Sequence, residues 1–336
     1  MNRDISAKKE GYYMNIKKIM YLNLNRRLKL KEKILLKIFK KEMLKIYRIG
    51  FYDGFEFNSP KAEKRLKKES TNKKCKINEI LKSERRVRMR NIKLTIEYDG
   101  KDFNGWQKQP NKLNIQGEIE RAIEEVTGEK VDLIASGRTD AGVHALAQVA
   151  NFKIQNMSIP VEKIPYALNS KLKKSIRIQS AEEVDDKFHS RYTCKKKTYR
   201  YTINNSEQGT AIYRNMQYHY PNKLDAQKMN EGAKYLIGEH DFKSFKASGT
   251  SSKSSVRTIY NAEVTQTGNQ IIIELTGNGF LYNMVRIIAG TLVEVGEGKI
   301  KPSDVKRILE AQDRLQAGKT LPANGLMLIN VEYEEN

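Results

Sequence analysis

Residues 91–100 read NIKLTIEYDG, and this stretch decides the fold class. Ile92, Leu94 and Ile96 alternate with polar residues, the period-two pattern of a strand with one buried face. Asp99 and Gly100 then supply the residue types of a turn. The stretch therefore predicts a strand of a sheet that has one apolar face and one polar face.

Patterns of helix and strand alternate from this strand onward. The predicted helices are 115–126, ended by Thr127-Gly128, 224–237, 280–295, and 303–311 with Ser303 as N-cap. The further predicted strands are 131–135, 147–154, 175–181, 197–203, 259–265, 270–275 and 325–333. Short turns between strands favour antiparallel pairing. We therefore expect an α+β fold of two similar halves, 89–190 and 191–336, whose mixed, mainly antiparallel sheets are flanked by helices. The cleft between the halves is the expected place for an active site.

The chain is strongly basic, and its charge is unevenly distributed. It holds 62 Lys+Arg against 40 Asp+Glu, a formal charge of +22. Residues 1–88 contain 27 Lys+Arg and 10 Asp+Glu, so this tract alone carries +17, and the remaining residues carry +5. A basic excess favours a polyanion such as nucleic acid as partner, ahead of an anionic membrane. Most of that signal lies outside the α+β part.

Three interpretations of residues 1–88 stay open. The tract is poor in apolar residues over 61–88, which is typical of disorder, whereas 29–47 could form a basic amphipathic helix. It is thus either an RNA-binding arm or an unstructured extension. The third hypothesis is that translation begins at Met89, immediately before the first strand. Peptides from residues before 89 in the native protein would contradict it.

Cysteine usage and hydropathy limit the compartment and the chemistry. The two cysteines are Cys75 and Cys194, and no Cys or His pair has the spacing of zinc ligands. A cytoplasmic protein without a metal site is expected. No uncharged apolar run is long enough for a transmembrane helix, and no signal peptide precedes the body, so no membrane partner is expected.

The segment Ser136–His144, SGRTDAGVH, lies between two predicted strands and carries the candidate chemistry. Gly137 and Gly142 permit a tight loop, in which Arg138 and Asp140 can point the same way. A neighbouring guanidinium lowers the pKa of a carboxyl group and keeps it an anion, which is the form that covalent catalysis needs. The alternative is structural, because Asp in a glycine-rich loop is often a turn residue or a helix cap.

The loop closely resembles the signature of the tRNA pseudouridine synthase A family. Further similar segments follow the family's order over residues 91–333: Phe103–Gln107, Phe188–Tyr192, Lys197–Tyr201, His240–Phe242 with Ser244-Phe245, and Asn278–Arg286. The resemblance implies the pseudouridine synthase fold. It also implies isomerisation of uridine to pseudouridine at positions 38–40, in the anticodon stem and loop of tRNA, without a cofactor.

The resemblance also implies roles for single residues. Asp140 is the catalytic aspartate, and Arg138 pairs with it and helps to fill the space left by a flipped base. Tyr199 lies against the uracil, and Arg286 is the second cation near Asp140. RNA contacts are expected at Phe188, His189, Ser190, Arg191, Tyr192 and Lys196. Family members are homodimers, so a homodimer that binds tRNA is expected here. Trp106 is interpreted as a packing residue, and Ser190 stands where the family usually has alanine.

Two other functions compete with this interpretation. A glycoside hydrolase normally uses two carboxylates, whereas the loop offers Asp140 alone. A non-catalytic RNA-binding or chaperone protein on the same fold would keep the RNA contacts without the reaction. The effect of Asp140→Asn on pseudouridine formation and on RNA binding discriminates between these functions.

Overall fold

The computed structural model describes residues 89–155, 158–249 and 254–334. These residues belong to one compact unit, Val87–Asn336. The predictions for residues 1–88 lie outside the described residues. Within the described ranges, no helix is long and apolar enough to cross a membrane.

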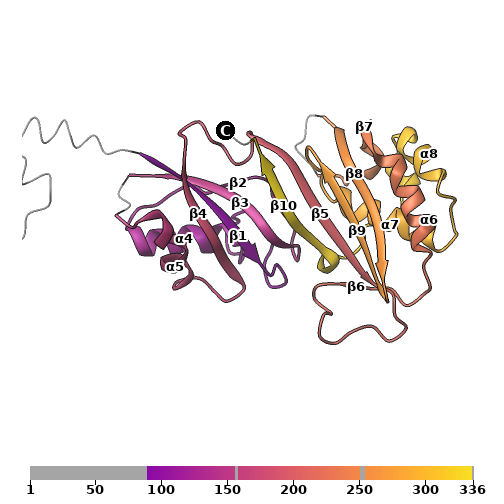
Figure 1. The fold of residues 1–336 in the computed structure, drawn as a ribbon, viewed down its shortest axis with the longest axis horizontal. Helices are drawn as coiled ribbons and strands as arrows, with labels where there is room; N and C mark the ends of the chain where they lie inside the picture. Colours follow the sequence, from indigo (N-terminus) through magenta and orange to yellow (C-terminus); the bar gives the residue numbers. More distant parts are fainter. Residues whose placement is uncertain (1–88, 156–157, 250–253, 335–336) are drawn as a thin grey trace, which may run out of the picture. The chain divides into compact units, whose positions relative to one another are not determined.

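The strands form one mixed, mainly antiparallel sheet (Figure 1). Its order is β4-β1-β3-β10-β5-β9-β8-β7, with β2 paired to β3 and β6 paired to β5. The strands are β1 Arg90–Tyr98, β2 Ile134–Ala135, β3 His144–Ile154, β4 Ile176–Val184, β5 Cys194–Asn204, β6 Tyr218–His219, β7 Gly238–Asp241, β8 Val256–Thr267, β9 Gln270–Gly277 and β10 Leu326–Tyr333. The α+β class is confirmed. The two expected sheets are joined into one, because β10 pairs with β3 on one side and with β5 on the other.

Helices lie beside both parts of the sheet (Figure 1). They are α4 Ile115–Thr127, α5 Ile164–Asn169, α6 Ala226–Ala233, α7 Met284–Gly296 and α8 Asp304–Ala311, with 3-10 turns η1 Val161–Lys163, η2 Lys234–Leu236, η3 Lys243–Phe245, η4 Arg314–Gln316 and η5 Ala323–Gly325. Helix α5 packs on β4, whereas α6 packs on β8 and α7 on β5. Burial alternates along β1 and β9. One face of these strands is therefore covered, and the other is partly open to solvent.

Strand β1 behaves as its period-two pattern predicts. Ile92, Leu94 and Ile96 are fully buried, and the polar residues between them are partly exposed. Burying each such side chain contributes about 1.5–3 kcal/mol. Helix α4 adds its own apolar stripe to this core, and it ends at Gly128, whose φ of 75° is left-handed. That ending confirms the stop predicted at Thr127-Gly128, because glycine adopts this conformation without steric cost.

Several predicted elements differ in their bounds or their caps. The helix predicted to begin at 280 begins at Met284, because Asn283 has a left-handed φ of 59°. The prediction that Ser303 caps α8 is wrong, because its backbone is already helical and its hydroxyl makes no capping bond. Asp304 accepts from the Lys301 amide at 2.8 Å instead. The strand predicted over 131–135 is reduced to β2.

Two buried asparagines hold the segment that follows β4. The Asn91 side chain donates to the carbonyls of Asp185 and Phe188, both at 2.9 Å. Asn151 donates to Asn91 Oδ1 at 2.9 Å and accepts from the Ser190 amide at 2.9 Å. The backbone of this segment is thus fixed by side chains of β1 and β3.

Ser190 is fully buried, and its hydroxyl has no hydrogen-bond partner among the described residues. Ser190→Ala is expected to raise the free energy of unfolding by about 1 kcal/mol, because it removes a buried polar group that no bond compensates. Urea unfolding measures the change.

Ser244 is the matched control. It is also fully buried, but its hydroxyl donates to the Ile308 carbonyl at 2.6 Å. Ser244→Ala leaves that carbonyl unpaired, so it should destabilise the protein by about 1–3 kcal/mol. Equal losses in both variants would contradict the prediction for Ser190.

Candidate active site

The segment after β1 holds the backbone of the Asp140 loop. The Trp106 amide donates to the Thr139 carbonyl at 3.0 Å, and the Gly142 amide donates to the Phe103 carbonyl at 3.3 Å. Gly105 has a φ of +84°, and a Cβ there would lie 2.6 Å from the Thr139 oxygen. The loop therefore rests against a backbone that only glycine can supply.

Thr139 fixes the loop immediately before Asp140. Its Oγ1 lies 2.7 Å from the Tyr98 hydroxyl in a buried hydrogen bond. Burial raises the pKa of Tyr98 to about 12, so the phenol stays neutral. Trp106 is buried beside Tyr98, which confirms that it is a packing residue. The side chain of Thr139 is thus turned into the protein.

The entry of the loop is held from two strands. Gln148 of β3 accepts from the Ser136 hydroxyl at 2.6 Å and donates to the Gly137 carbonyl at 2.9 Å. Lys197 of β5 donates from Nζ to the Ser136 carbonyl at 2.5 Å. Both carbonyls that precede Arg138 therefore accept hydrogen bonds from side chains of the sheet.

The Asp140 carboxylate is half-buried and accessible. Its side chain is 29% exposed, and Oδ2 lies 3.7 Å from Nη1 of Arg286. Burial raises the pKa of Asp140, and the Arg286 guanidinium opposes that rise. Among the described residues the side chain makes no capping hydrogen bond. The structural alternative of a helix cap is therefore wrong.

Arg286 is held rigidly at the start of α7. Its Nε donates to the Leu321 carbonyl at 2.6 Å, and Nη1 donates to Asn283 Oδ1 at 2.7 Å. Because α7 belongs to the second half and Asp140 to the first, the pair joins residues from both halves. These two acceptors orient the guanidinium independently of its contact with the carboxylate.

The expectation that Arg138 pairs with Asp140 is wrong in this structure. Arg138 is exposed and makes no ion pair with the described residues. The expected lowering of the Asp140 pKa by Arg138 is also wrong, because burial raises that pKa and the opposing cation is Arg286. The prediction assumed an extended loop, in which the side chains of Arg138 and Asp140 point the same way. The backbone over residues 139–143 instead forms a turn, in which the Val143 amide donates to the Asp140 carbonyl at 3.1 Å.

Tyr199 lies on β5, with its ring edge-on to Phe280 at 5.1 Å between centroids. Burial raises the pKa of Tyr199, and the negative charge of Asp140 raises it further. Its hydroxyl therefore stays protonated and makes no hydrogen bond to the described residues. The ring is buried, with 8% of the residue exposed, and a phenolate base is disfavoured.

The predicted RNA contacts differ widely in accessibility. Tyr192 is 77% exposed and stacks on His189 at 4.2 Å, and Arg191 is exposed beside it. Phe188 is half-buried and packs on Tyr333 at 4.9 Å. Ser190 is buried, so its predicted RNA contact is not compatible with this structure.

Lys196 is exposed on β5, 3.7 Å from Glu332 and over the ring of Tyr260. The alternation along β5 puts it on the other face from Lys197 and Tyr199. It remains accessible to a ligand, although its charge is already paired.

Sequence reasoning missed the residues that support the loop, among them Tyr98, Gln148 and Lys197. Lys197 had a usable signal, because it lies two residues before Tyr199 on a strand and therefore shares its face. Gln148 had none, since a buried glutamine within a strand cannot be told from an exposed one by pattern.

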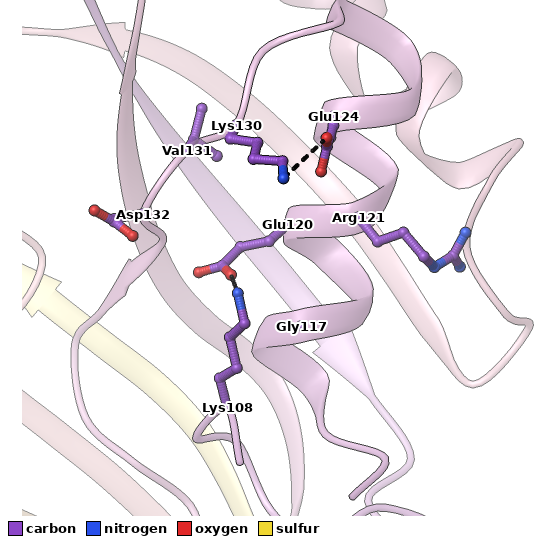
Figure 2. Close-up of a pocket in the computed structure, with 8 residues that line it drawn as sticks. All are labelled: Lys108, Gly117, Glu120, Arg121, Glu124, Lys130, Val131 and Asp132. Carbon is purple, nitrogen blue, oxygen red and sulfur yellow. Dashed lines mark hydrogen bonds and ion pairs between the residues drawn. The ribbon is translucent and has the colours of Figure 1, made fainter. Parts of the chain in front are cut away.

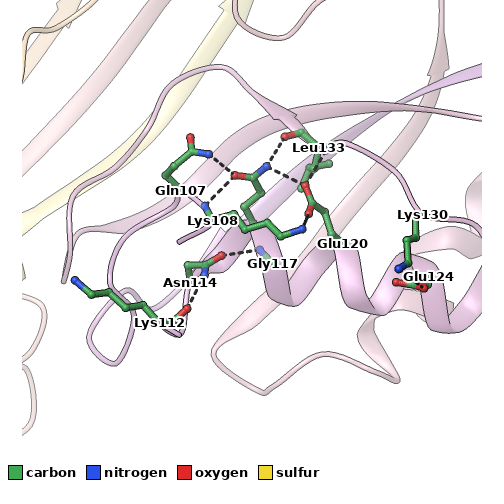
Figure 3. Close-up of polar contacts among 10 residues, drawn as sticks. Gln107, Lys108, Lys112, Asn114, Gly117, Glu120, Glu124, Lys130 and Leu133 are labelled. Atoms are coloured by element: carbon green, nitrogen blue, oxygen red, sulfur yellow. Dashed lines mark hydrogen bonds and ion pairs between the residues drawn. The ribbon is translucent and has the colours of Figure 1, made fainter. Parts of the chain in front are cut away.

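A hollow of about 360 Å³ lies beside α4 (Figure 2), and Asp140 is not among the residues that line it. It is lined by Lys108, Gly117, Glu120, Arg121, Glu124, Lys130, Val131 and Asp132. Glu120 accepts from Lys108 Nζ, from Gln116 and from the Leu133 amide, at 2.9, 2.9 and 3.1 Å (Figure 3). Its carboxylate is thus fully used in fastening the chain to α4, and the hollow is structural.

No group of three His, Cys, Asp or Glu side chains in the described ranges is arranged to hold a metal ion. The cation described next to Asp140 is the guanidinium of Arg286. Proton transfer or nucleophilic attack by the carboxylate is the chemistry that this arrangement can supply.

Gly105→Ala should lower the rate of the catalysed reaction by at least about tenfold, because the new Cβ displaces the backbone of the Asp140 loop. The rate is measured with substrate in excess, alongside thermal unfolding.

Gly128→Ala is the matched control. Its φ of +75° imposes a similar backbone strain, but nothing lies within 4 Å of the new Cβ. A similar loss of rate in both variants would show that strain, and not the loop, is responsible.

His144 follows the loop and is buried, with Nδ1 accepting from the Gly100 amide at 3.1 Å. Burial lowers the pKa of His144 from 6.5, against the opposing effect of Asp99. The folded state therefore holds this histidine neutral, and the free energy of unfolding should fall as the pH drops below about 6.5. NMR titration of the ring, with urea unfolding between pH 7 and 5, checks the prediction. A His144 that titrates above pH 6.5 would refute it.

Comparison with known proteins agrees with the motif series. The family described as tRNA pseudouridine synthase matches residues 94–193 and 233–334. A protein of Caldicellulosiruptor bescii named tRNA pseudouridine synthase A is 54% identical over 245 residues, which is 73% of this chain and 100% of that protein. Proteins of the same name from Clostridium acetobutylicum and Acetivibrio thermocellus are 53% and 52% identical, with the same coverage. The chain therefore belongs to the tRNA pseudouridine synthase family, among the proteins named tRNA pseudouridine synthase A.

Proposed function

We propose that this chain isomerises uridine to pseudouridine at positions 38–40 of tRNA, with Asp140 as the catalytic residue. Its family membership makes it an isomerase of uridine in tRNA. The target positions in the anticodon stem and loop, and the role of Asp140, rest on the resemblance of the loop 136–144. A cytoplasmic homodimer without a cofactor belongs to the same proposal.

The position of the Asp140 carboxylate is the observation that carries the proposal. It is accessible to solvent, faces one fixed guanidinium and serves no capping role among the described residues. A structural aspartate would be expected to use its oxygens in hydrogen bonds to the backbone. A carboxylate held apart from such bonds, on a loop fixed at both ends, is available for a substrate.

The reaction rearranges bonds without gaining or losing atoms. The bond from N1 of uracil to C1′ of the ribose breaks, the base rotates, and a bond from C5 to C1′ forms. The proton of C5 is lost and N1 becomes protonated, so the product is an isomer. Asp140 acts on the sugar in the first step, either as the nucleophile at C1′ or as the base that deprotonates the sugar. Either route needs the carboxylate ionised.

The nucleotide must leave its stack to reach this carboxylate. Extrusion of a base costs a few kcal/mol, and an aromatic face can return about 1–3 kcal/mol. Tyr199 supplies such a surface near Asp140. Arg138, exposed and without an ion pair among the described residues, is free to enter the space that the base leaves. Its absence from the ion pair with Asp140 supports this role.

The exposed residues after β4 extend the proposed RNA surface. Arg191 and Tyr192, together with Lys196 on β5, present cations and an aromatic ring to solvent, and Phe188 and His189 lie half-buried beside them. Cations neutralise phosphates, and rings stack on bases. Ser190 is left out, because its side chain is buried.

Asp140→Asn should abolish pseudouridine formation while tRNA binding remains within about threefold of the native protein, because the amide is isosteric but is neither a nucleophile nor a base. Chemical mapping of pseudouridine on tRNA and a filter-binding assay measure the two properties. Asp132→Asn is the control, since this exposed carboxylate lies beside α4 and away from the site.

Unchanged modification by Asp140→Asn would refute the proposal, and free uracil as the wild-type product would identify a hydrolase instead. A wild-type protein that binds tRNA without modifying it would be the non-catalytic alternative.

Arg286→Met should move the acidic limb of the pH–rate profile to higher pH. Burial raises the pKa of Asp140 and Arg286 opposes the rise, so removing the guanidinium leaves the carboxyl protonated up to a higher pH. Arg138→Met is the comparison and should leave the limb in place, whatever it does to the absolute rate. A shift caused by Arg138→Met alone would show that Arg138 is the cation that controls Asp140.

A further inference from the structure

Lys197 is a part-buried lysine that the catalytic roles above leave unused. Its Nζ donates to the Ser136 carbonyl at 2.5 Å, at the entry of the Asp140 loop. It lies on β5, two residues before Tyr199, with its side chain on the same face of the strand. The neighbouring Lys195 and Lys196 differ from it, because both are exposed and paired with glutamates.

The charge environment of Lys197 is unusual. Among the described residues no carboxylate forms an ion pair with its Nζ. Burial lowers the pKa of Lys197, the nearby cations Arg191 and Arg257 lower it further, and Cys194 opposes them. Burying an ammonium group without a counter-charge costs stability. A surface-facing lysine would avoid that cost, so a specific contact has to account for its position.

The contact that Lys197 makes is with the loop backbone. Ser136 and Gly137 supply two successive carbonyl groups, of which Gln148 of the first half binds one and Lys197 of the second half binds the other. The hydrogen bond of Lys197 thus ties the loop to the strand that carries Tyr199. It fixes the loop four residues before Asp140, on the side opposite to the contacts made by Phe103 and Trp106.

Gly137 leaves the space that this ammonium group occupies. A Cβ at Gly137 would lie 3.0 Å from Lys197 Nζ and 3.8 Å from its Cε, with no other heavy atom within 4 Å. The backbone of Gly137 is not in the left-handed region. A side chain at position 137 would therefore press on the ammonium group of Lys197 and on no other described heavy atom.

We propose that Lys197 is a positioning residue, which holds the Asp140 loop at the catalytic distance from Tyr199 through its hydrogen bond to the Ser136 carbonyl. The inference rests on the proposed role of Asp140. Lys197 does not touch the reacting atoms, so its loss should lower the rate of the chemical step and leave tRNA affinity nearly unchanged.

The first test compares substitutions at two adjacent lysines in the full chain. Lys197→Met should lower the single-turnover rate at saturating enzyme by about tenfold to a hundredfold, with the KM for tRNA changed less than threefold. Lys197→Arg keeps a charged donor and should restore the rate to within about threefold. Lys196→Met, which alters a proposed RNA contact, is the comparison and should raise the KM for tRNA. A Lys197→Met variant that changes KM alone would overturn the proposal.

The second test is a double-mutant cycle that probes the same contact from the side of Gly137. Gly137→Ala should lower the rate in the native background, because its methyl group displaces the ammonium group. In a Lys197→Ala background the space is empty, so the same substitution should cost at least threefold less. Additive effects, including no effect in either background, would overturn the proposal.

Asp140→Asn, measured in the same assay, separates the two levels of inference. An active Asp140→Asn variant refutes the proposed function and the role of Lys197 with it. An inactive Asp140→Asn variant beside a Lys197→Met variant with the native single-turnover rate refutes the role of Lys197 alone.

Discussion

The half-burial of one carboxylate against one guanidinium is the constraint on which the site depends. Asp140 is removed from water far enough for its pKa to rise, and Arg286 holds it near enough to a cation to oppose that rise. Neither residue is free to adjust, because the loop is hydrogen-bonded along its backbone and the guanidinium is bound to Leu321 and Asn283. The ionised carboxylate is therefore maintained by geometry that both halves of the fold supply.

Much of this fold follows from local patterns. The alternation over β1, the amphipathic α4 with its glycine stop and the hairpin of β8 and β9 were predictable, because each depends on residues that are close in the chain. The joining of two sheets into one was not predictable. The pairing of β10 with β3 links residues far apart in sequence, and only two residue pairs define it.

The residues of the candidate site also divide into those that the sequence predicted and those that it did not. Asp140, Tyr199 and Arg286 were identified from motifs, and the structure brings charges of Asp140 and Arg286 together. Of the two cations expected near Asp140, Arg286 lies against it and Arg138 does not, because neighbourhood in sequence does not determine direction in a turning loop. Ser190 was assigned to the surface although two buried asparagines draw its segment inward. The sequence around a side chain such as Lys197 does not show which distant backbone group that side chain will bind.

The place of β10 has a consequence for synthesis on the ribosome. It is the last described strand in chain order, yet it lies between β3 and β5. Until residues 326–333 leave the exit tunnel, the parts of β3 and β5 that pair with β10 are unpaired edges, and such edges invite pairing with other nascent chains. The two parts of the sheet can form beforehand, but they become continuous only when translation of this strand is complete. Assembly of the shared sheet therefore has to wait until residues 326–333 have been made and are free to pair.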